Sequence, residues 1–154
     1  MTLYRGRLDQ TGVLDLTDLS KVIGTTGYAI LPVSVEGLTG DKALSPSRSE
    51  DAMIDTGATT TAVHPSLARE LDLEQVGREL GGDAQEDHLM YVPLYRVRIT
   101  ISVIEGEWDL PAMGRDYPYP HLFRIIIGND ILKSCRFTFD GPADSFTLEL
   151  QHAS

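Results

Sequence analysis

The chain holds a single cysteine, Cys135, among its 154 residues, so no disulfide can form within it. It also lacks any run of about 18 apolar residues, the length that a transmembrane helix needs. Residues 1–7 carry none of the apolar stretch of a secretory signal peptide. From these absences we expect a cytoplasmic protein that makes no membrane contact.

Positive charge is also scarce. The 13 Lys and Arg residues face 23 Asp and Glu residues, which gives a net charge of −10 and a pI near 4.7. Nucleic-acid binding demands a basic face, so nucleic acid is not an expected partner. The 4 histidines are scattered, without His-x-x-x-His spacing or a cysteine pair, and we expect neither a metal nor a cofactor. No Gly-x-Ser-x-Gly turn suggests a serine nucleophile.

The length suits one domain with a modest core. We divide the chain into an N-terminal extension, residues 1–26, and a main domain, residues 27–151. Within the extension, apolar residues recur at helical spacing over residues 16–23 and Gly24 follows, which predicts a short helix.

From Tyr28 onward the pattern is that of a mostly β chain. Apolar residues alternate over residues 31–35, where Pro32 favours an edge strand, and most cleanly over residues 95–103. The pair Gly81-Gly82 predicts a hairpin tip. Further strands are expected at residues 52–54, 125–127, 137–139 and 146–150, and short helices after Pro65 and at 129–133.

The most informative segment is Asp55-Thr56-Gly57-Ala58-Thr59, which follows an apolar strand. An aspartic protease needs a carboxylate on a sharp loop, a hydroxyl beside it, and a glycine that lets the backbone approach closely. A turn-capping aspartate is the plain alternative for Asp55, because Asp is common in turns.

A second element follows about seventy residues later, where Ile126, Ile127 and Gly128 precede two polar residues and an apolar pair. Together the two elements resemble the retropepsin-like, or retroviral-type, aspartic protease family, over residues 28–150. The resemblance implies a mostly β, single-lobe acid protease fold with closed, barrel-like sheets and one or two short helices. It also implies that Ile126, Ile127 and Gly128 pass beneath the catalytic loop, where a Cβ on the glycine would collide with it.

The resemblance further implies roles around the loop. Thr56 would bond across a two-fold axis, Gly57 would offer its carbonyl to substrate, Ala58 would line the cleft and Thr59 would support the loop. The flap over the substrate would be the hairpin around residues 80–83. Its candidate residues are Leu80, Gly81, Gly82 and Asp83. Asn129 stands where viral members often have arginine, and Thr59 and Thr60 where they commonly have acidic groups.

The chain has only one Asp-Thr-Gly, whereas this chemistry uses two carboxylates that share one proton. The dyad must then be Asp55 of two identical subunits, so we expect a homodimer. The predicted function is an aspartic endopeptidase that hydrolyses peptide or protein substrates by an activated water, at acidic to mildly acidic pH. The alternative is a catalytically silent module of the same fold for dimerisation or peptide binding.

Overall fold

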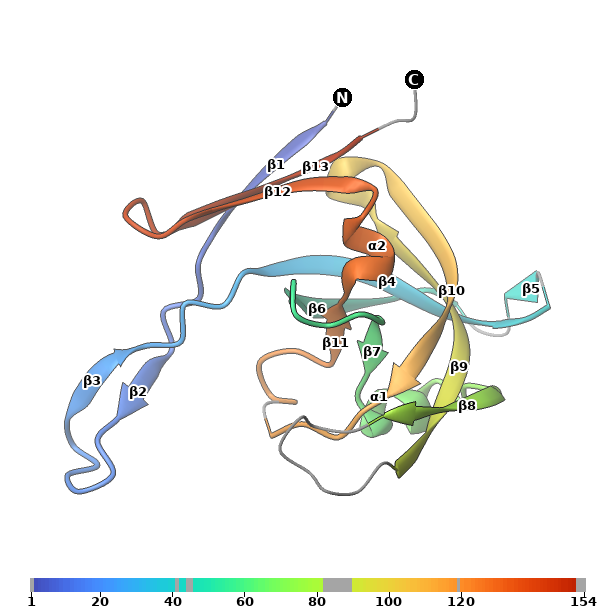
Figure 1. Ribbon diagram of the computed structural model, residues 1–154, viewed down its shortest axis with the longest axis horizontal. Coiled ribbons are helices and arrows are strands. Elements are labelled where there is room, and N and C mark those ends of the chain that lie inside the picture. The colour runs from blue at the N-terminus through green and yellow to red at the C-terminus, as the bar shows by residue number, and fades with distance from the viewer. Residues whose placement is uncertain (1, 41, 44–45, 82–89, 119, 152–154) are drawn as a thin grey trace.

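A computed structural model of the chain describes residues 2–40, 42–43, 46–81, 90–118 and 120–151 (Figure 1). This part is mostly strand, and none of its helices is long and apolar enough to cross a membrane. In chain order the elements are β1 (Leu3–Arg7), β2 (Gly12–Leu14), β3 (Val22–Thr25), β4 (Ile30–Thr39), β5 (Lys42–Ala43), β6 (Arg48–Ile54), β7 (Ala62–Val63), α1 (Pro65–Glu70), β8 (Gln75–Gly81), β9 (Met90–Ile101), the 3-10 turn η1 (Ser102–Ile104), β10 (Gly106–Gly114), β11 (Ile125–Ile127), α2 (Asn129–Leu132), β12 (Cys135–Asp140) and β13 (Ser145–Leu150).

A closed barrel of six strands forms the body, in the order β4-β6-β11-β7-β10-β9. The ring closes where β4 and β9 pair antiparallel, from Ser34 opposite Thr100 to Gly37 opposite Val97. β5 adds to β4 and β8 adds to β9 outside the ring. The mostly β, single-lobe fold with short helices is therefore confirmed.

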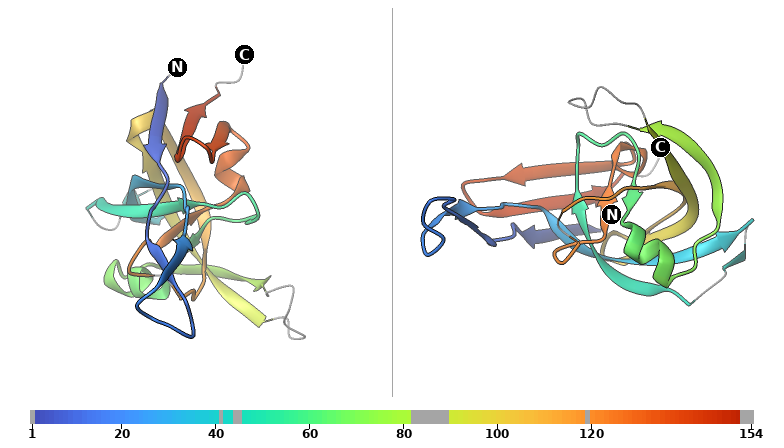
Figure 2. Two further views of the ribbon diagram at one scale, coloured as in Figure 1. Left: turned by 90° about the vertical axis from the view of Figure 1, so that its left-hand side faces the viewer. Right: turned by 90° about the horizontal axis from the view of Figure 1, so that it is seen from below.

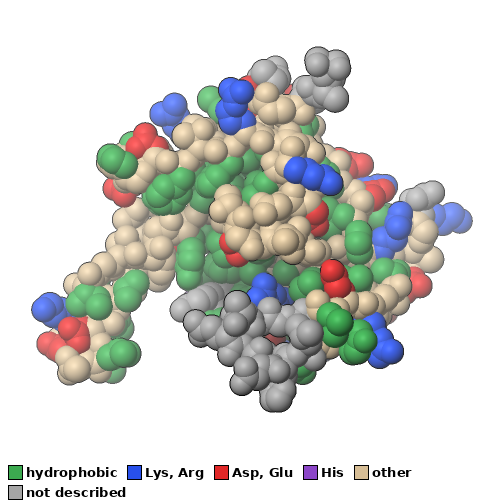
Figure 3. Space-filling view, viewed as in Figure 1, with side chains coloured by type: hydrophobic (Ala, Val, Ile, Leu, Met, Phe, Trp, Pro, Cys, Tyr) green, Lys and Arg blue, Asp and Glu red, His purple; other side chains and the backbone are tan. Residues whose placement is uncertain are grey.

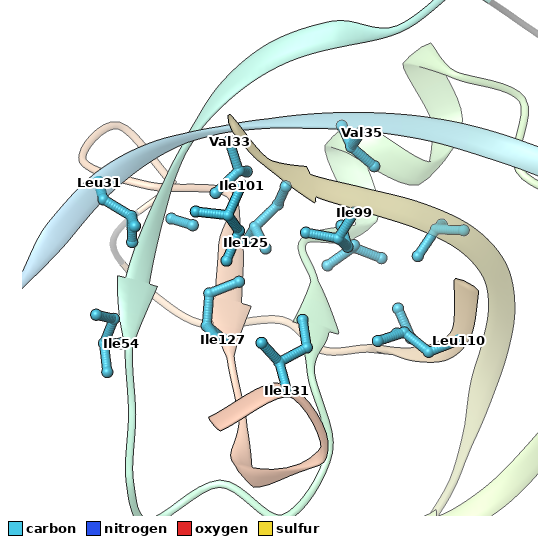
Figure 4. Close-up of a cluster of buried hydrophobic side chains, with 14 of the residues drawn as sticks. Leu31, Val33, Val35, Ile54, Ile99, Ile101, Leu110, Ile125, Ile127 and Ile131 are labelled. Atoms are coloured by element: carbon cyan, nitrogen blue, oxygen red, sulfur yellow. The ribbon is translucent and has the colours of Figure 1, made fainter. Parts of the chain in front are cut away.

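Alternate residues of the barrel strands point inward and fill it with aliphatic side chains (Figure 4). In β9, Val97, Ile99 and Ile101 are fully buried, as the alternation predicted. The strand ends at Ile101, because η1 turns the chain toward β10. Each such burial contributes about 1.5–3 kcal/mol to stability. The same core cluster contains side chains from other barrel strands, including Leu31, Val33, Val35, Ile125 and Ile127.

The edge position predicted from Pro32 is wrong for the strand as a whole. β4 lies between β6 and β9, so it is an interior strand of the barrel. The proline is accommodated because β9 pairs with β4 only from Ser34 onward, while Pro32 sits opposite Asp51 of β6. Its missing N–H therefore removes no bond from the β4–β9 ladder.

The two ends of the chain meet in a second sheet, ordered β1-β13-β12, which we call the terminal sheet (Figure 1). Gly6 of β1 lies opposite Phe146 of β13, and a Cβ on Gly6 would stand 2.5 Å from the buried phenyl ring. Residues 3–7 thus pack on the body of the molecule. Whether residues 1–26 act as a separate unit stays a prediction.

The helix predicted over residues 16–23 is wrong. β2 and β3 form an antiparallel hairpin that stands out from the body (Figures 1 and 2). Asp15 accepts bonds from the backbone N–H and hydroxyl of Thr17, and Asp18 accepts the same pair from Ser20. Such local bonds compete with helix formation. The apolar residues that suggested a helix, Leu16, Leu19, Val22 and Ile23, are exposed instead, as are the nearby Val13 and Leu14 (Figure 3).

The residues predicted to form the flap begin in β8, which pairs antiparallel with β9. Gly81 ends β8 opposite Met90, so it belongs to the strand ladder and is not the tip that the Gly81-Gly82 pair predicted. Leu80 lies opposite Tyr91 and is half-exposed. Gly82 and Asp83, the other flap candidates, lie outside the described residues.

The helix predicted after Pro65 is confirmed as α1. His64 is its N-cap: Nδ1 accepts a hydrogen bond from the backbone N–H of Ser66 at 3.1 Å. Pro65 stands at the first position, where no N–H is needed. Leu67 and Ala68 face the core.

Candidate active site

Asp55 comes directly after β6, at the point where that strand runs parallel to β11. The two strands are in register from Ala52 opposite Ile125 to Ile54 opposite Ile127. The backbone N–H of Asp55 continues the ladder by donating to the Ile127 carbonyl at 3.0 Å. Asp55 therefore has a fixed place at the end of two core strands. Ile54 and Ile127, the last residues of these strands, are labelled in Figure 4.

Residues 55–58 form a tight turn around the carboxylate. The backbone N–H of Ala58 donates to the Asp55 carbonyl at 3.1 Å, and that of Gly57 donates to the side-chain Oδ1 of Asp55 at 2.9 Å. Asp55 is half-buried, while Thr56, Gly57 and Thr59 are exposed. Ala58 is buried and packs with Ala62, Phe123 and Ile126. The carboxylate is thus held from one side on an otherwise open loop.

Gly128 lies directly beneath this loop. A Cβ at this position would stand 2.7 Å from the carbonyl carbon of Thr60, 2.8 Å from its oxygen and 2.9 Å from the nitrogen of Thr61. These are backbone atoms that cannot rotate away, so the crossing requires a residue without a side chain. Ile126 and Ile127 precede it on opposite faces of β11: Ile127 enters the barrel core, and Ile126 joins the cluster that holds Ala58.

Thr61 and Asp130, which the sequence did not single out, hold the loop in place where it passes over Gly128. Thr61 is fully buried, and its hydroxyl accepts from the Gly128 N–H at 3.1 Å while donating to Oδ1 of Asp130 at 2.6 Å. The backbone N–H of Thr61 donates to the same carboxylate at 3.1 and 3.0 Å. A polar residue directly before the buried β7 pair Ala62-Val63 is the one sequence signal that pointed to Thr61.

Asn129 also supports the loop, to which it donates two hydrogen bonds. Its backbone N–H donates to the Ala58 carbonyl at 2.7 Å, and its side-chain Nδ2 donates to the Thr56 carbonyl at 3.0 Å. The sequence had marked Asn129 only as a departure from the viral pattern. Its hydrogen-bond partners lie 71 and 73 residues away along the chain, so only the fold brings them together.

An ion cluster holds the start of β11 against β6 and α1. Arg124 pairs with Glu50 of β6 and, at 2.7 Å, with Glu70 of α1, which also pairs with Arg48 at 2.6 Å. The hydrogen bond with Glu50 is the main reason that the pKa of Arg124 is raised, and the bond from Arg124 lowers the pKa of Glu70. The cluster anchors the strand that carries the Ile-Ile-Gly element.

Among the described residues no three His, Cys, Asp or Glu side chains are grouped so as to hold a metal ion. His64 caps α1 and its Nε2 lies 3.3 Å from Asp116. The site therefore consists of one carboxylate, its turn and the supports beneath it.

Comparison with solved structures identifies the fold. A retropepsin-like aspartic protease from Rickettsia conorii matches 95% of this chain and 91% of its own length, with a TM-score of 0.52 and 12% identity. EIAV protease, complexed with the inhibitor HBY-793, matches 70% of this chain and 88% of its own, with a TM-score of 0.46 and 17% identity. The retroviral protease-like domain of Ddi1 from Leishmania major matches 80% and 94%, with a TM-score of 0.42 and 12% identity.

No protein-family model matches the chain, and no curated protein matches its sequence. The likeness to the Rickettsia structure, at 12% identity, concerns the fold alone. The chain therefore has a retropepsin-like fold of the aspartic protease type, as the two sequence elements predicted.

Proposed function

We propose that the protein is an aspartic endopeptidase whose dyad is made by Asp55 of two identical subunits. The observation that carries the proposal is the Asp55 turn itself. A carboxylate at the end of two core strands accepts the Gly57 N–H on one oxygen and stays half-exposed, within a retropepsin-like fold. A plain turn-capping aspartate would not require the Gly128 crossing and the Thr61–Asp130 bonds beneath it.

The chemistry follows from two such carboxyls sharing one proton. The ionised member takes a proton from a water molecule, whose oxygen attacks the carbonyl carbon of the scissile peptide. The protonated member gives its proton to the carbonyl oxygen, which forms a tetrahedral intermediate. The carboxyl that took the proton from water then gives it to the leaving nitrogen, while a hydroxyl of the intermediate returns its proton to the other carboxylate. The carbon–nitrogen bond breaks, a carboxyl product forms, and the dyad again holds one proton.

A second copy is needed because one chain supplies one carboxylate. Thr56 and Gly57 are exposed beside Asp55, where they are free to meet the partner loop and the substrate backbone. Ala58 and Thr59 complete the loop, and Ile126, Ile127 and Gly128 support it. The β8–β9 hairpin, with Leu80 and Gly81 on β8, is proposed as the flap, together with Gly82 and Asp83.

The wider setting belongs to the same proposal. The catalytic domain covers residues 27–151, residues 1–26 precede it as an extension, and the substrate is a peptide or protein. The proposed compartment is the cytoplasm. Neither a cofactor nor a nucleic-acid or membrane partner takes part.

The test compares the wild type with Asp55→Asn, which keeps the size of the side chain and removes the ionisable group. A pool of unstructured peptides is incubated with each protein between pH 4 and pH 7, and new termini are identified by mass spectrometry. We expect cleavage by the wild type only, strongest at the acidic end. Asp51→Asn, the same change at an exposed position of β6, serves as a control that should retain cleavage.

Equal cleavage by the wild type and Asp55→Asn would refute the proposal. Sedimentation equilibrium tests whether two subunits form the dyad, because the wild type should then be a dimer at the concentrations where it cleaves. A dimer without cleavage at any pH would favour the silent dimerisation or peptide-binding module instead.

A further inference from the structure

Asn129 holds the catalytic loop by a route that reaches Asp55. Its Nδ2 donates to the Thr56 carbonyl at 3.0 Å. A carbonyl oxygen can only accept, so the amide group must present its nitrogen to the loop. The carbonyl of Thr56 and the N–H of Gly57 belong to one planar peptide unit. That same N–H donates to Oδ1 of Asp55 at 2.9 Å.

A continuous chain of hydrogen bonds therefore runs from the Asn129 amide, through the Thr56–Gly57 peptide, to the Asp55 carboxylate. Fixing the carbonyl end of a planar unit also fixes the direction of its N–H. A donor on the carbonyl oxygen polarises the peptide and strengthens the bond that the N–H makes, as in other linked hydrogen bonds. Asn129 thus acts on both the orientation and the strength of the Gly57 donation.

We infer that Asn129 is a positioning residue that sets the hydrogen bond received by the Asp55 carboxylate. The catalytic consequence rests on the proposed function, whereas the link from Asn129 to the carboxylate is a property of the loop itself. The Asn129 side chain is exposed, so the core does not depend on it. Its backbone N–H bond to Ala58 does not involve the side chain, so Asn129→Leu and Asn129→Gln keep α2 attached to the loop.

The charge of the neighbouring Asp130 carboxylate does not account for a change in the Gly57–Asp55 hydrogen bond. Asp130, the next residue of α2, faces Thr61 and is bonded to its backbone and hydroxyl. It is unchanged in the variants below, so any change in the Gly57–Asp55 hydrogen bond reports the Asn129 amide.

The experiment uses the full chain with Asn129→Leu, which keeps the shape without a donor, and Asn129→Gln, which keeps a donor on a longer arm. Lys133→Leu, an exposed change just after α2, is the matched control. Two readouts need no activity. One is the proton chemical shift of the Gly57 amide, and the other is the rate at which that amide proton exchanges with solvent, both by NMR on labelled protein.

In Asn129→Leu we expect the Gly57 amide proton to move upfield and to exchange faster with solvent than in the wild type, because its hydrogen bond to the Asp55 carboxylate is weaker. Asn129→Gln should lie between the two, and Lys133→Leu should match the wild type. For cleavage, Asn129→Leu should lower kcat about three- to tenfold with little change in KM, the size of one lost net hydrogen bond.

Unchanged NMR signals in Asn129→Leu, or equal changes in Asn129→Leu and Lys133→Leu, would overturn the inference. If the wild type shows no Asp55-dependent cleavage, the proposed function fails, and the two NMR readouts still decide the role of Asn129.

Discussion

Replacing Gly128 by alanine tests the packing beneath the Asp55 loop most directly. The added Cβ would meet three backbone atoms of Thr60 and Thr61 at 2.7 to 2.9 Å. Real Cβ contacts are longer than this, so either β11 or the loop must move. Neither moves alone, because the Gly128 N–H is bonded to the Thr61 hydroxyl at 3.1 Å and Asn129 is bonded to Ala58 at 2.7 Å.

The cost follows from these contacts. Overpacking a filled site costs about 1–3 kcal/mol, and losing one of the clamping hydrogen bonds adds about 0.5–1.5 kcal/mol. We therefore expect Gly128→Ala to lower the free energy of unfolding by about 2–4 kcal/mol. For a chain of this size that corresponds to a fall in Tm of about 5–15 °C.

Gly24→Ala is the matched control, because a Cβ there would meet no atom within 4 Å and the residue has no positive φ. It should change stability by less than about 0.5 kcal/mol. Urea unfolding of both variants, followed by the fluorescence of Trp108, the one tryptophan, gives the comparison. Protomer concentration must be equal in all samples, since dimerisation would contribute to stability.

A Gly128→Ala variant as stable as Gly24→Ala would refute the reasoning, because the loop would then tolerate a side chain beneath it. A stability loss with full cleavage activity would refute the link from this crossing to the Asp55 geometry. A loss of both is the expected result.

Two further predictions concern other supports. Thr61→Val keeps the side-chain shape but removes the hydroxyl that bonds the Gly128 N–H and the Asp130 carboxylate, so the free energy of unfolding should fall by about 2–4 kcal/mol. The exposed Thr59→Val is its control in urea unfolding. Equal free energies of unfolding in the two variants would contradict the role of the Thr61 hydroxyl. Asp109 accepts Arg98 Nε at 2.7 Å, and this bond lowers the pKa of the carboxyl. Its contribution to stability is present above the unfolded pKa of about 3.9 and is lost as pH falls through the lower folded value. The stability gap between the wild type and Asp109→Asn should therefore be constant from pH 7 to about pH 5 and narrow in more acidic solution; a gap that widens on acidification would contradict this assignment.

Local sequence patterns predicted most of the strands, because successive side chains of a strand point to opposite faces of the sheet. Val97, Ile99 and Ile101 stand at every second position because all three face the barrel core, while Arg98 and Thr100 between them are only partly buried. Pro32 shows where this reasoning stops. Because proline has no N–H, the strand lacks a hydrogen-bond donor at Pro32. This does not make the strand an edge strand, since β9 pairs with it from Ser34 onward. The helix predicted over residues 16–23 was wrong for a related reason. Apolar residues at helical spacing indicate a helix only if the rest of the protein buries that face, and here these residues are exposed.

The candidate site divides in the same way. Asp55, Gly57 and Gly128 were predictable because turn chemistry and close approach each demand a particular residue type. The contacts of Thr61, Asn129 and Asp130 were not, because each joins the loop to α2 across 69 to 73 residues. Hydrogen-bond partners at that separation depend on how the barrel closes.

The sequence by itself determined a mostly β chain with one carboxylate on a Thr-Gly turn and a glycine-terminated apolar strand to pair with it. Residue type and spacing suffice for that, since strand faces and turns are set by near neighbours. Only the tertiary structure decided that β4 and β9 close the ring, that β6 and β11 run side by side to Asp55, and that Asn129 reaches the Thr56 carbonyl. These contacts join distant segments, and they form only when packing of the barrel brings both partners to the same place.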